Sequence, residues 1–259
     1  MHLEFWQLAV VMFAAYGIGL AKTGITGVGI VAVALFAYAL GPASVGVVLP
    51  LLICTDCIAV LYYRRHAVWS HLWRLFPWAA VGIIMGWFTM QRINERHVGH
   101  LIGALLLMLT CLQLAQRVQA ARRKAQNPEG EPEALPVGLL ASGGLITIAL
   151  GILAGFATMV ANAAGPLMVL YLLAARLPKM EFVGTAAWYY FCLNLFKVPF
   201  SWHLGLLNLP ALRLDLMLLP FAILGAFTGR RILPHINQRL FETLALFFTA
   251  LAALKLLFT

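Results

Sequence analysis

Charged side chains are scarce in this sequence, and their scarcity excludes an ordinary soluble domain. Asp, Glu, Lys and Arg make up 10% of the 259 residues, against about 25% in typical soluble domains. Hydrophobic residues make up 63%, and they gather in stretches close to the roughly 17–25 residues that a membrane-spanning helix needs. The composition therefore predicts a polytopic membrane protein whose surroundings are the lipid bilayer.

The familiar motifs of enzymes are also missing. The sequence has no H-E-x-x-H, no Walker loop and no G-x-S-x-G, which are the patterns of zinc-dependent hydrolysis, phosphate binding and nucleophilic serine chemistry. We therefore expect no enzyme activity, no cofactor and no metal. No basic segment precedes the first apolar run, so we expect no cleavable signal peptide.

The four cysteines and the net charge of +9 have simple interpretations. All four cysteines fall within apolar segments, where a thiol behaves as a small hydrophobic side chain. Cys54 and Cys57 form a C-x-x-C around Asp56, but no second cysteine pair or histidine cluster accompanies them, so the metal or redox signal is weak. The basic residues are scattered at segment ends, where the positive-inside bias places Lys and Arg in cytoplasmic loops. Because this bias accounts for most of the positive charge, we expect no nucleic-acid partner.

The apolar segments recur in the same order in the two halves of the chain. They cover residues 5–22, 30–40, 45–63, 72–90 and 98–115, and then 136–157, 167–175, 182–200, 214–228 and 244–258. We predict an all-α fold of eight to ten segments: a first transmembrane repeat over 1–118, a charged cytoplasmic linker over 119–135 and a second repeat over 136–259. Each repeat has about five segments, the first of which is broken or forms a hairpin.

The halves also match residue by residue. A shift of 143 positions aligns seven identical residues among the twenty positions 77–96, including Pro77 with Pro220, and a shift of 136 aligns Gly19 with Gly155. Such self-similarity indicates an internal repeat. With five segments in each half, 12 of the 18 basic residues fall on one face of the membrane. The positive-inside bias then predicts inverted halves with both termini outside.

One break interrupts the apolar sequence of each half. The first contains Gly24, Gly27 and Gly29, and the second reads Asn162-Ala163-Ala164-Gly165-Pro166. A membrane tolerates broken backbone only where it is buried in protein or lines a wet cavity, and the N-terminus of a helix attracts anions. Inverted-repeat transporters bind substrates between such discontinuous helices. We therefore predict an anion site at the breaks; alternatively, the glycines only allow close helix packing.

Polar and ionisable residues within the apolar segments complete the candidate site, and Lys22 borders the first break. Lys197 could attract the anion or extend to the outer surface, and Asp56 could carry a coupling proton or make a structural hydrogen bond. The aromatic cluster that contains Tyr190 could line the cavity or serve in packing. The predicted substrate-binding residues are Gly24, Thr26, Gly27, Gly29, Asn162, Ala163, Gly165, Pro166, Tyr190, Asn194 and Lys197, and Asp56 is the predicted proton carrier.

Three groups of residues carry a resemblance to a known family. They are the glycine-containing break at 24–29, the series Asp56-x-x-Ala59-x-x-x-Tyr63-Arg64-Arg65, and Ala161-Asn162-Ala163-Ala164-Gly165-Pro166 followed by Asn194-Leu195-Phe196-Lys197-x-Pro199. In these the chain resembles the TauE/SafE family of bacterial sulfite exporters. The resemblance implies transport of sulfite, sulfoacetate or a related organosulfonate across the bacterial inner membrane. With the repeats, the breaks and Asp56, we expect a proton-coupled secondary transporter that works by alternating access.

Alternatives to this interpretation remain open at the level of sequence. A membrane-embedded enzyme or assembly factor would use Asp56 with the Cys54 and Cys57 pair, and a channel would share the fold without gradient coupling. The direction of transport is open, because one site serves uptake and export alike. The expected partners are the small anionic substrate and the lipid bilayer, and pairing with a second copy of the chain in a homodimer stays open.

Overall fold

The computed structural model describes residues 3–23, 28–92, 144–175 and 177–232, together with scattered positions between 97 and 118. The helices within the continuous ranges are α1 (Phe5–Thr23), α2 (Val28–Leu40), α3 (Ser44–Tyr63), α4 (Trp69–Arg92), α7 (Gly144–Ala161), α8 (Gly165–Ala174), α9 (Lys179–His203) and α10 (Leu209–Ile232). The predicted segment 244–258, the linker 119–135 and most of the segment 98–115 lie outside the described residues.

The described residues contain helices and no strand, which confirms the prediction of an all-α membrane protein. Four stretches of them are long and apolar enough to cross a membrane: Phe5–Thr23, Val28–His66, Trp69–Arg92 and Leu209–Arg231. In lipid, a helix is the conformation that satisfies every backbone N–H and C=O within one segment. The apolar sequence thus leads directly to this bundle, and the chain is a multi-pass membrane protein.

Both predicted breaks separate a longer helix from a short one. α1 ends at Thr23 and α2 begins at Val28, whereas α7 ends at Ala161 and α8 begins at Gly165. α7 continues four residues past the predicted end at 157, because residues 158–161 include neither Gly nor Pro. With 13 and 10 residues, α2 and α8 extend about 20 and 15 Å, too short for a hydrocarbon core of about 30 Å.

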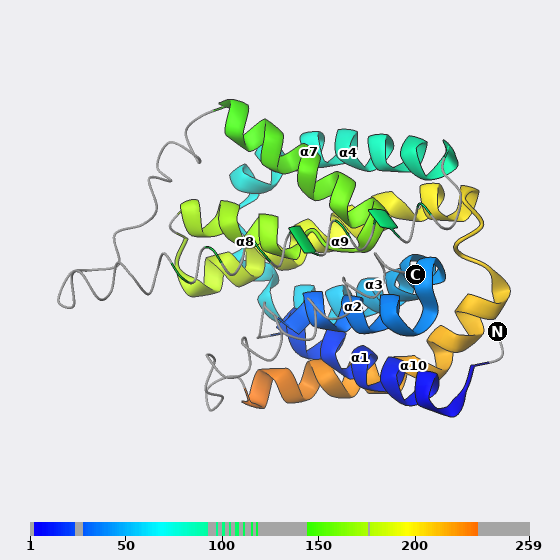
Figure 1. Ribbon diagram of the computed structural model, residues 1–259. Coiled ribbons are helices and arrows are strands. Elements are labelled where there is room, and N and C mark those ends of the chain that lie inside the picture. Colours follow the sequence, from blue (N-terminus) through cyan, green and yellow to red (C-terminus); the bar gives the residue numbers. More distant parts are fainter. Residues whose placement is uncertain are drawn as a thin grey trace.

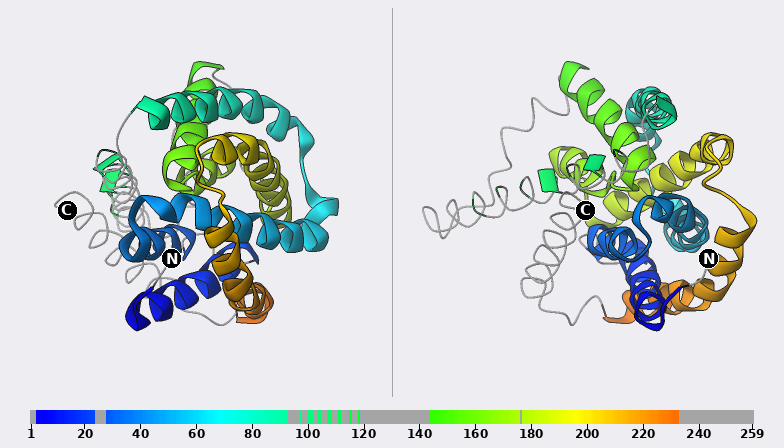
Figure 2. Two further views of the ribbon diagram at one scale, coloured as in Figure 1. Left: turned by 90° about the vertical axis from the view of Figure 1, so that its right-hand side faces the viewer. Right: turned by 45° about the vertical axis from the view of Figure 1, so that its right-hand side comes forward.

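The helices lie in pairs that form successive layers (Figure 1 and Figure 2). α4 and α7 form one outer layer, α1 and α10 form the opposite one, and α8, α9, α2 and α3 lie between them. One core cluster of buried side chains is centred on α4, α7, α8 and α9, and a second on α1, α2, α3 and α10. α3 packs directly on α9, so the two clusters meet in the middle of the molecule.

Matching glycine contacts relate the two outer pairs. A Cβ added at Gly19 of α1 would lie 1.9 Å from the carbonyl oxygen of Ala222 on α10, and one added at Gly155 of α7 would lie 1.9 Å from that of Ala79 on α4. The shifts of 136 and 143 positions carry residue 19 to 155 and residue 79 to 222. In Figure 1, α1 runs from right to left and α7 from left to right, as inverted repeats require.

Basic side chains gather at one end of the bundle. The short helix η2 (Arg64–His66) follows α3 there and exposes its arginines. The guanidinium of Arg230, at the end of α10, lies 4.3 Å from the centre of the Tyr62 ring at the end of α3. The positive-inside bias predicts that this end faces the cytoplasm.

Candidate functional site

A cavity of about 90 Å³ lies between the two helix breaks. Its walls come from the end of α1, the start of α2, the middle of α3, both sides of the α7–α8 break and one face of α9. The lining is mainly apolar, and its polar side chains are Lys22, Thr158, Asn162, Tyr190 and Asn194. A few polar groups in an apolar concave wall are typical of small-molecule sites.

The end of α1 is tied to its neighbours and holds Lys22 at the cavity. Thr23 is fully buried; its hydroxyl donates hydrogen bonds to the carbonyl oxygens of Gly19 at 3.2 Å and of Ala226 on α10 at 2.8 Å. The Tyr63 hydroxyl of α3 donates to the carbonyl oxygen of Thr23 at 3.0 Å. The Tyr63 contact satisfies the carbonyl of Thr23, a group that a helix end leaves without an intrahelical partner, and the Thr23 hydroxyl ties α1 to α10.

Asn162 forms the turn that ends α7. Its φ of 51° lies in the left-handed region, which Asn tolerates better than most residues. Its backbone N–H donates to the carbonyl oxygen of Thr158 at 3.0 Å, which is the usual bond of a left-handed helix C-cap. Its side-chain amide donates to the carbonyl oxygen of Val45 on α3 at 3.0 Å. The break is therefore a defined turn that α3 supports.

Lys197 of α9 neutralises the same helix end. Its ammonium donates to the carbonyl oxygen of Thr158 at 2.8 Å and to the side-chain oxygen of Asn162. A cation at the C-terminus of a helix is favoured by the helix dipole. Lys197 is fully buried, so it does not extend to the surface, and it contacts residues that line the cavity without lining it itself.

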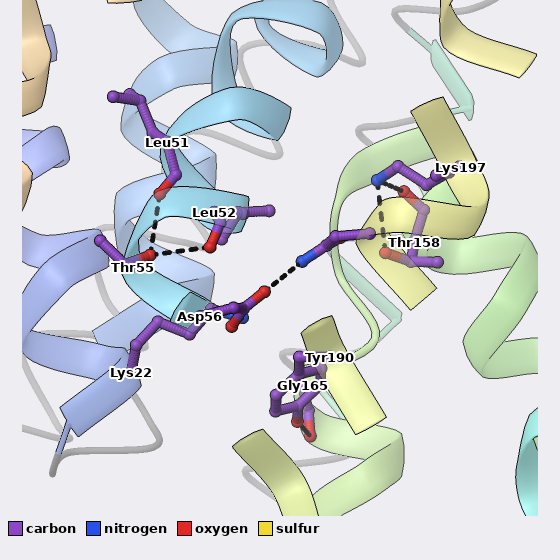
Figure 3. Close-up of polar contacts among 10 residues, drawn as sticks. Lys22, Leu51, Leu52, Thr55, Asp56, Thr158, Gly165, Tyr190 and Lys197 are labelled. Atoms are coloured by element: carbon purple, nitrogen blue, oxygen red, sulfur yellow. Dashed lines mark hydrogen bonds and ion pairs between the residues drawn. The ribbon is translucent and has the colours of Figure 1, made fainter. Parts of the chain in front are cut away.

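A second polar group joins α1, α3 and α9 (Figure 3). The Lys22 ammonium lies 2.6 Å from Oδ1 of Asp56, and the Asn194 amide donates to Oδ2 of Asp56 at 2.6 Å. The same ammonium lies 4.2 Å from the centre of the Tyr190 ring, within the range of a cation–π contact. Tyr190 in turn donates to the carbonyl oxygen of Gly165 at 3.4 Å.

The electrostatics of the site favour an anion. Its charged side chains are two lysines and one aspartate, and Lys197 contacts neutral oxygen atoms rather than a carboxylate. α2 and α8 both begin at the cavity, and neither has an acidic residue in its first turn. Each helix N-terminus adds a partial positive charge and free N–H donors. The C-termini of α1 and α7 lie at the same cavity and add partial negative charge that offsets those N-termini, so the excess positive charge of the site comes from its side chains, two lysines against one aspartate.

A family comparison identifies the protein's relatives. Residues 11–256 match the model of a family described as Sulfite exporter TauE/SafE. The chain belongs to this family. No curated protein and no solved structure matches it. The TauE/SafE match confirms the resemblance noted in the sequence, and membership in a family of exporters agrees with the multi-pass membrane fold.

The structure brings together most of the residues predicted for this TauE/SafE site. Those that line the cavity are Gly29, Asn162, Ala163, Gly165, Tyr190 and Asn194. Asp56 and Lys197 bond to lining residues from behind. Pro166 belongs to the first turn of α8, and Gly24, Thr26 and Gly27 lie outside the described residues.

Lys22 and Thr158 were absent from the predicted binding set, although both line the cavity of this TauE/SafE protein. A signal for Lys22 existed, because a lysine beside a break in apolar sequence is costly in lipid and usually functional. Thr158 had no such signal. Its hydroxyl becomes relevant only when the fold places it within 3.5 Å of the Lys197 ammonium.

The cysteines take no part in the cavity. Cys54 and Cys57 are free thiols, and neither lines the space between the breaks. Among the residues that the structure describes, no group of three His, Cys, Asp or Glu side chains could hold a metal ion.

Proposed function

We propose that this protein is a secondary transporter that moves a small sulfur-containing anion across the bacterial inner membrane. Sulfite, sulfoacetate and related organosulfonates are the substrates we expect, by analogy with the family. The observation that carries the proposal is the cavity between the two helix breaks, where Lys22 and the N-termini of α2 and α8 meet. Inverted-repeat transporters use such a site for alternating access.

The size of the cavity supports a small solute. Its volume of about 90 Å³ is well below the roughly 300–1,000 Å³ of pockets that hold drug-sized ligands. Apolar side chains form much of its wall, which lowers the local dielectric and strengthens attraction between the site and an anion. A compact oxyanion suits this combination better than a bulky conjugate.

The proposed roles divide between direct ligands and supporting residues. The N–H groups near Gly29 and Gly165 bind the anion at the ends of α2 and α8, and Asn162 donates or accepts a hydrogen bond from the break itself. Lys197 supplies positive charge from behind Asn162. Asp56 carries the coupling proton. The N-termini of α2 and α8 belong to different repeats, and each moves with its own repeat. The same site therefore opens alternately to the two faces of the membrane.

Flux measurements test this function. The purified full-length protein is reconstituted into liposomes, and uptake and efflux of labelled sulfite, sulfoacetate and taurine are followed with a pH gradient of either sign. We expect saturable flux of at least one of these anions, above that of protein-free liposomes. Flux that rises without saturation and ignores the gradient would indicate a channel. No flux of any sulfur anion, in either direction and with either gradient, would refute the proposal.

A further inference from the structure

We propose that Lys22 is the principal ligand of the transported anion, and that the bound anion displaces Asp56 from Lys22, so that Asp56 takes up one proton for each anion bound. This exchange rests on the proposed transport function and specifies its coupling. In the resting state Lys22 is paired with Asp56. The anion then competes with Asp56 for the ammonium of Lys22.

The position of Lys22 supports the first part of the proposal. Lys22 lines the cavity, and its side chain is 12% exposed, whereas that of Asp56 is completely buried. Among the described residues, its ammonium contacts the Asp56 carboxylate and the face of the Tyr190 ring. An ammonium has three N–H donors, so donors remain for a solute in the cavity.

The position of Asp56 supports the second part. Asp56 does not line the cavity, and its side chain is buried behind Lys22, so a solute in the cavity meets Lys22 and not the carboxylate. If the anion draws the ammonium away, Asp56 keeps the neutral Asn194 amide as its remaining hydrogen-bond donor among the described residues. A buried carboxylate that loses its counter-ion is strongly destabilised. Protonation removes that charge.

The charge and proton balance of the exchange is closed. Before binding, the ammonium of Lys22 is paired with the carboxylate of Asp56. Afterwards the ammonium is paired with the anion, and one oxygen of Asp56 carries a proton that came from water. One anion and one proton enter the site together, so its net charge is unchanged when the anion is monovalent.

Few other titratable groups face Asp56 from the described residues. They are Lys197, Tyr190 and Cys192 on α9 and Cys57 on α3 itself. Lys197 is held by Thr158 and Asn162, so it cannot replace Lys22 as the direct partner of Asp56 without breaking the α7 end. Asp215 of α10 is also buried but faces Cys54, which makes it a matched control.

Binding measurements on the purified full-length protein test the exchange. Methanesulfonate and sulfoacetate serve as probes, because a sulfonate group keeps its charge over the range used. Affinity for each is measured by calorimetry from about pH 8 to about pH 6, and we expect it to rise by up to tenfold per pH unit, the limit for one linked proton. Calorimetry in buffers of different ionisation enthalpy should show the uptake of about one proton per anion.

The variants separate the two residues. Asp56→Asn should abolish the pH dependence and bind the probes at high pH about as well as the unmodified protein does at low pH. Lys22→Gln should lose binding at every pH, while Lys22→Arg retains it. The double variant Lys22→Gln/Asp56→Asn leaves neither charge unpaired, which favours folding, and it should still fail to bind.

Two controls match these changes. Asp215→Asn removes another buried carboxylate, and Arg92→Gln removes another basic residue from the last turn of a helix; both should keep the wild-type affinity and pH dependence. The exchange is overturned if Asp56→Asn keeps the pH dependence or if the folded double variant binds like the unmodified protein. If the unmodified protein neither binds nor transports any sulfur anion, the proposed function fails as well.

Discussion

The contact between α4 and α7 makes Gly155 a sensitive test of this structure. A Cβ at Gly155 would lie 1.9 Å from the carbonyl oxygen and 2.7 Å from the carbonyl carbon of Ala79. Real Cβ atoms essentially never approach another heavy atom within 3.0 Å. Gly155→Ala must therefore push the two helices apart by about 1.1 Å, because the opposing atoms are backbone and cannot rotate away.

The energy of this change can be worked out from opposing terms. Overpacking a tight interface costs about 1–3 kcal/mol, and the upper end applies here because two backbones collide. Ala gains about 1 kcal/mol over Gly in helix propensity. We expect a net loss of about 2 kcal/mol for Gly155→Ala, which lowers the Tm by roughly 4–8 °C for a protein of this size.

The assay is thermal unfolding of the purified protein in detergent, followed by loss of the monodisperse peak in size-exclusion chromatography. Gly144→Ala is the matched control, since it adds the same methyl group to the same helix with nothing within 4 Å; its Tm should stay equal or rise. Gly19→Ala should lower the Tm as much as Gly155→Ala, because it meets Ala222 in the corresponding way. Equal Tm values for Gly155→Ala and Gly144→Ala would refute the packing.

Three further predictions concern the site. Asn162→Gly keeps a left-handed backbone that Gly adopts freely but loses the side-chain hydrogen bonds to Val45 and to the buried Lys197, so we expect a moderate fall in Tm and about a tenfold fall in anion affinity. Asn162→Ala should lower the Tm further, since its backbone strain costs roughly 1–2 kcal/mol. Lys197→Met should weaken sulfite binding about tenfold without abolishing it, because Lys197 does not line the cavity; unchanged affinity would remove it from the site. Cys54→Ala/Cys57→Ala should keep full flux, and loss of flux would favour the alternative of a membrane-embedded enzyme or assembly factor that uses the cysteine pair.

Much of the architecture could be predicted from the sequence. The two offsets of the repeat paired Gly19 with Gly155, and the structure gives both residues the same close contact with the opposite half. The breaks were predictable as well, because Gly, Asn and Pro inside apolar sequence are costly unless they serve a purpose. The residues that flank each break do line one cavity.

The partners within the site could not be predicted in the same way. Asp56 meets Asn194 across 138 residues of sequence, and Lys197 meets Thr158 across 39. Such contacts depend on how each helix is rotated and tilted against its neighbours. The sequence had therefore suggested that Lys197 could be a direct ligand, whereas the structure places Lys22 at the cavity and Lys197 behind Asn162.

The sequence by itself determined that the chain is a helical membrane protein with a duplicated plan and two interrupted segments, because the bilayer forces every apolar stretch to satisfy its own backbone. Only the tertiary structure decided which face of each helix turns inward. Lipid tails are as apolar as leucine side chains, so Leu61 is 68% exposed while Leu49 on the same helix is fully buried. Hydropathy does not distinguish these faces, and the pairing of Lys22 with Asp56 follows from the packing alone.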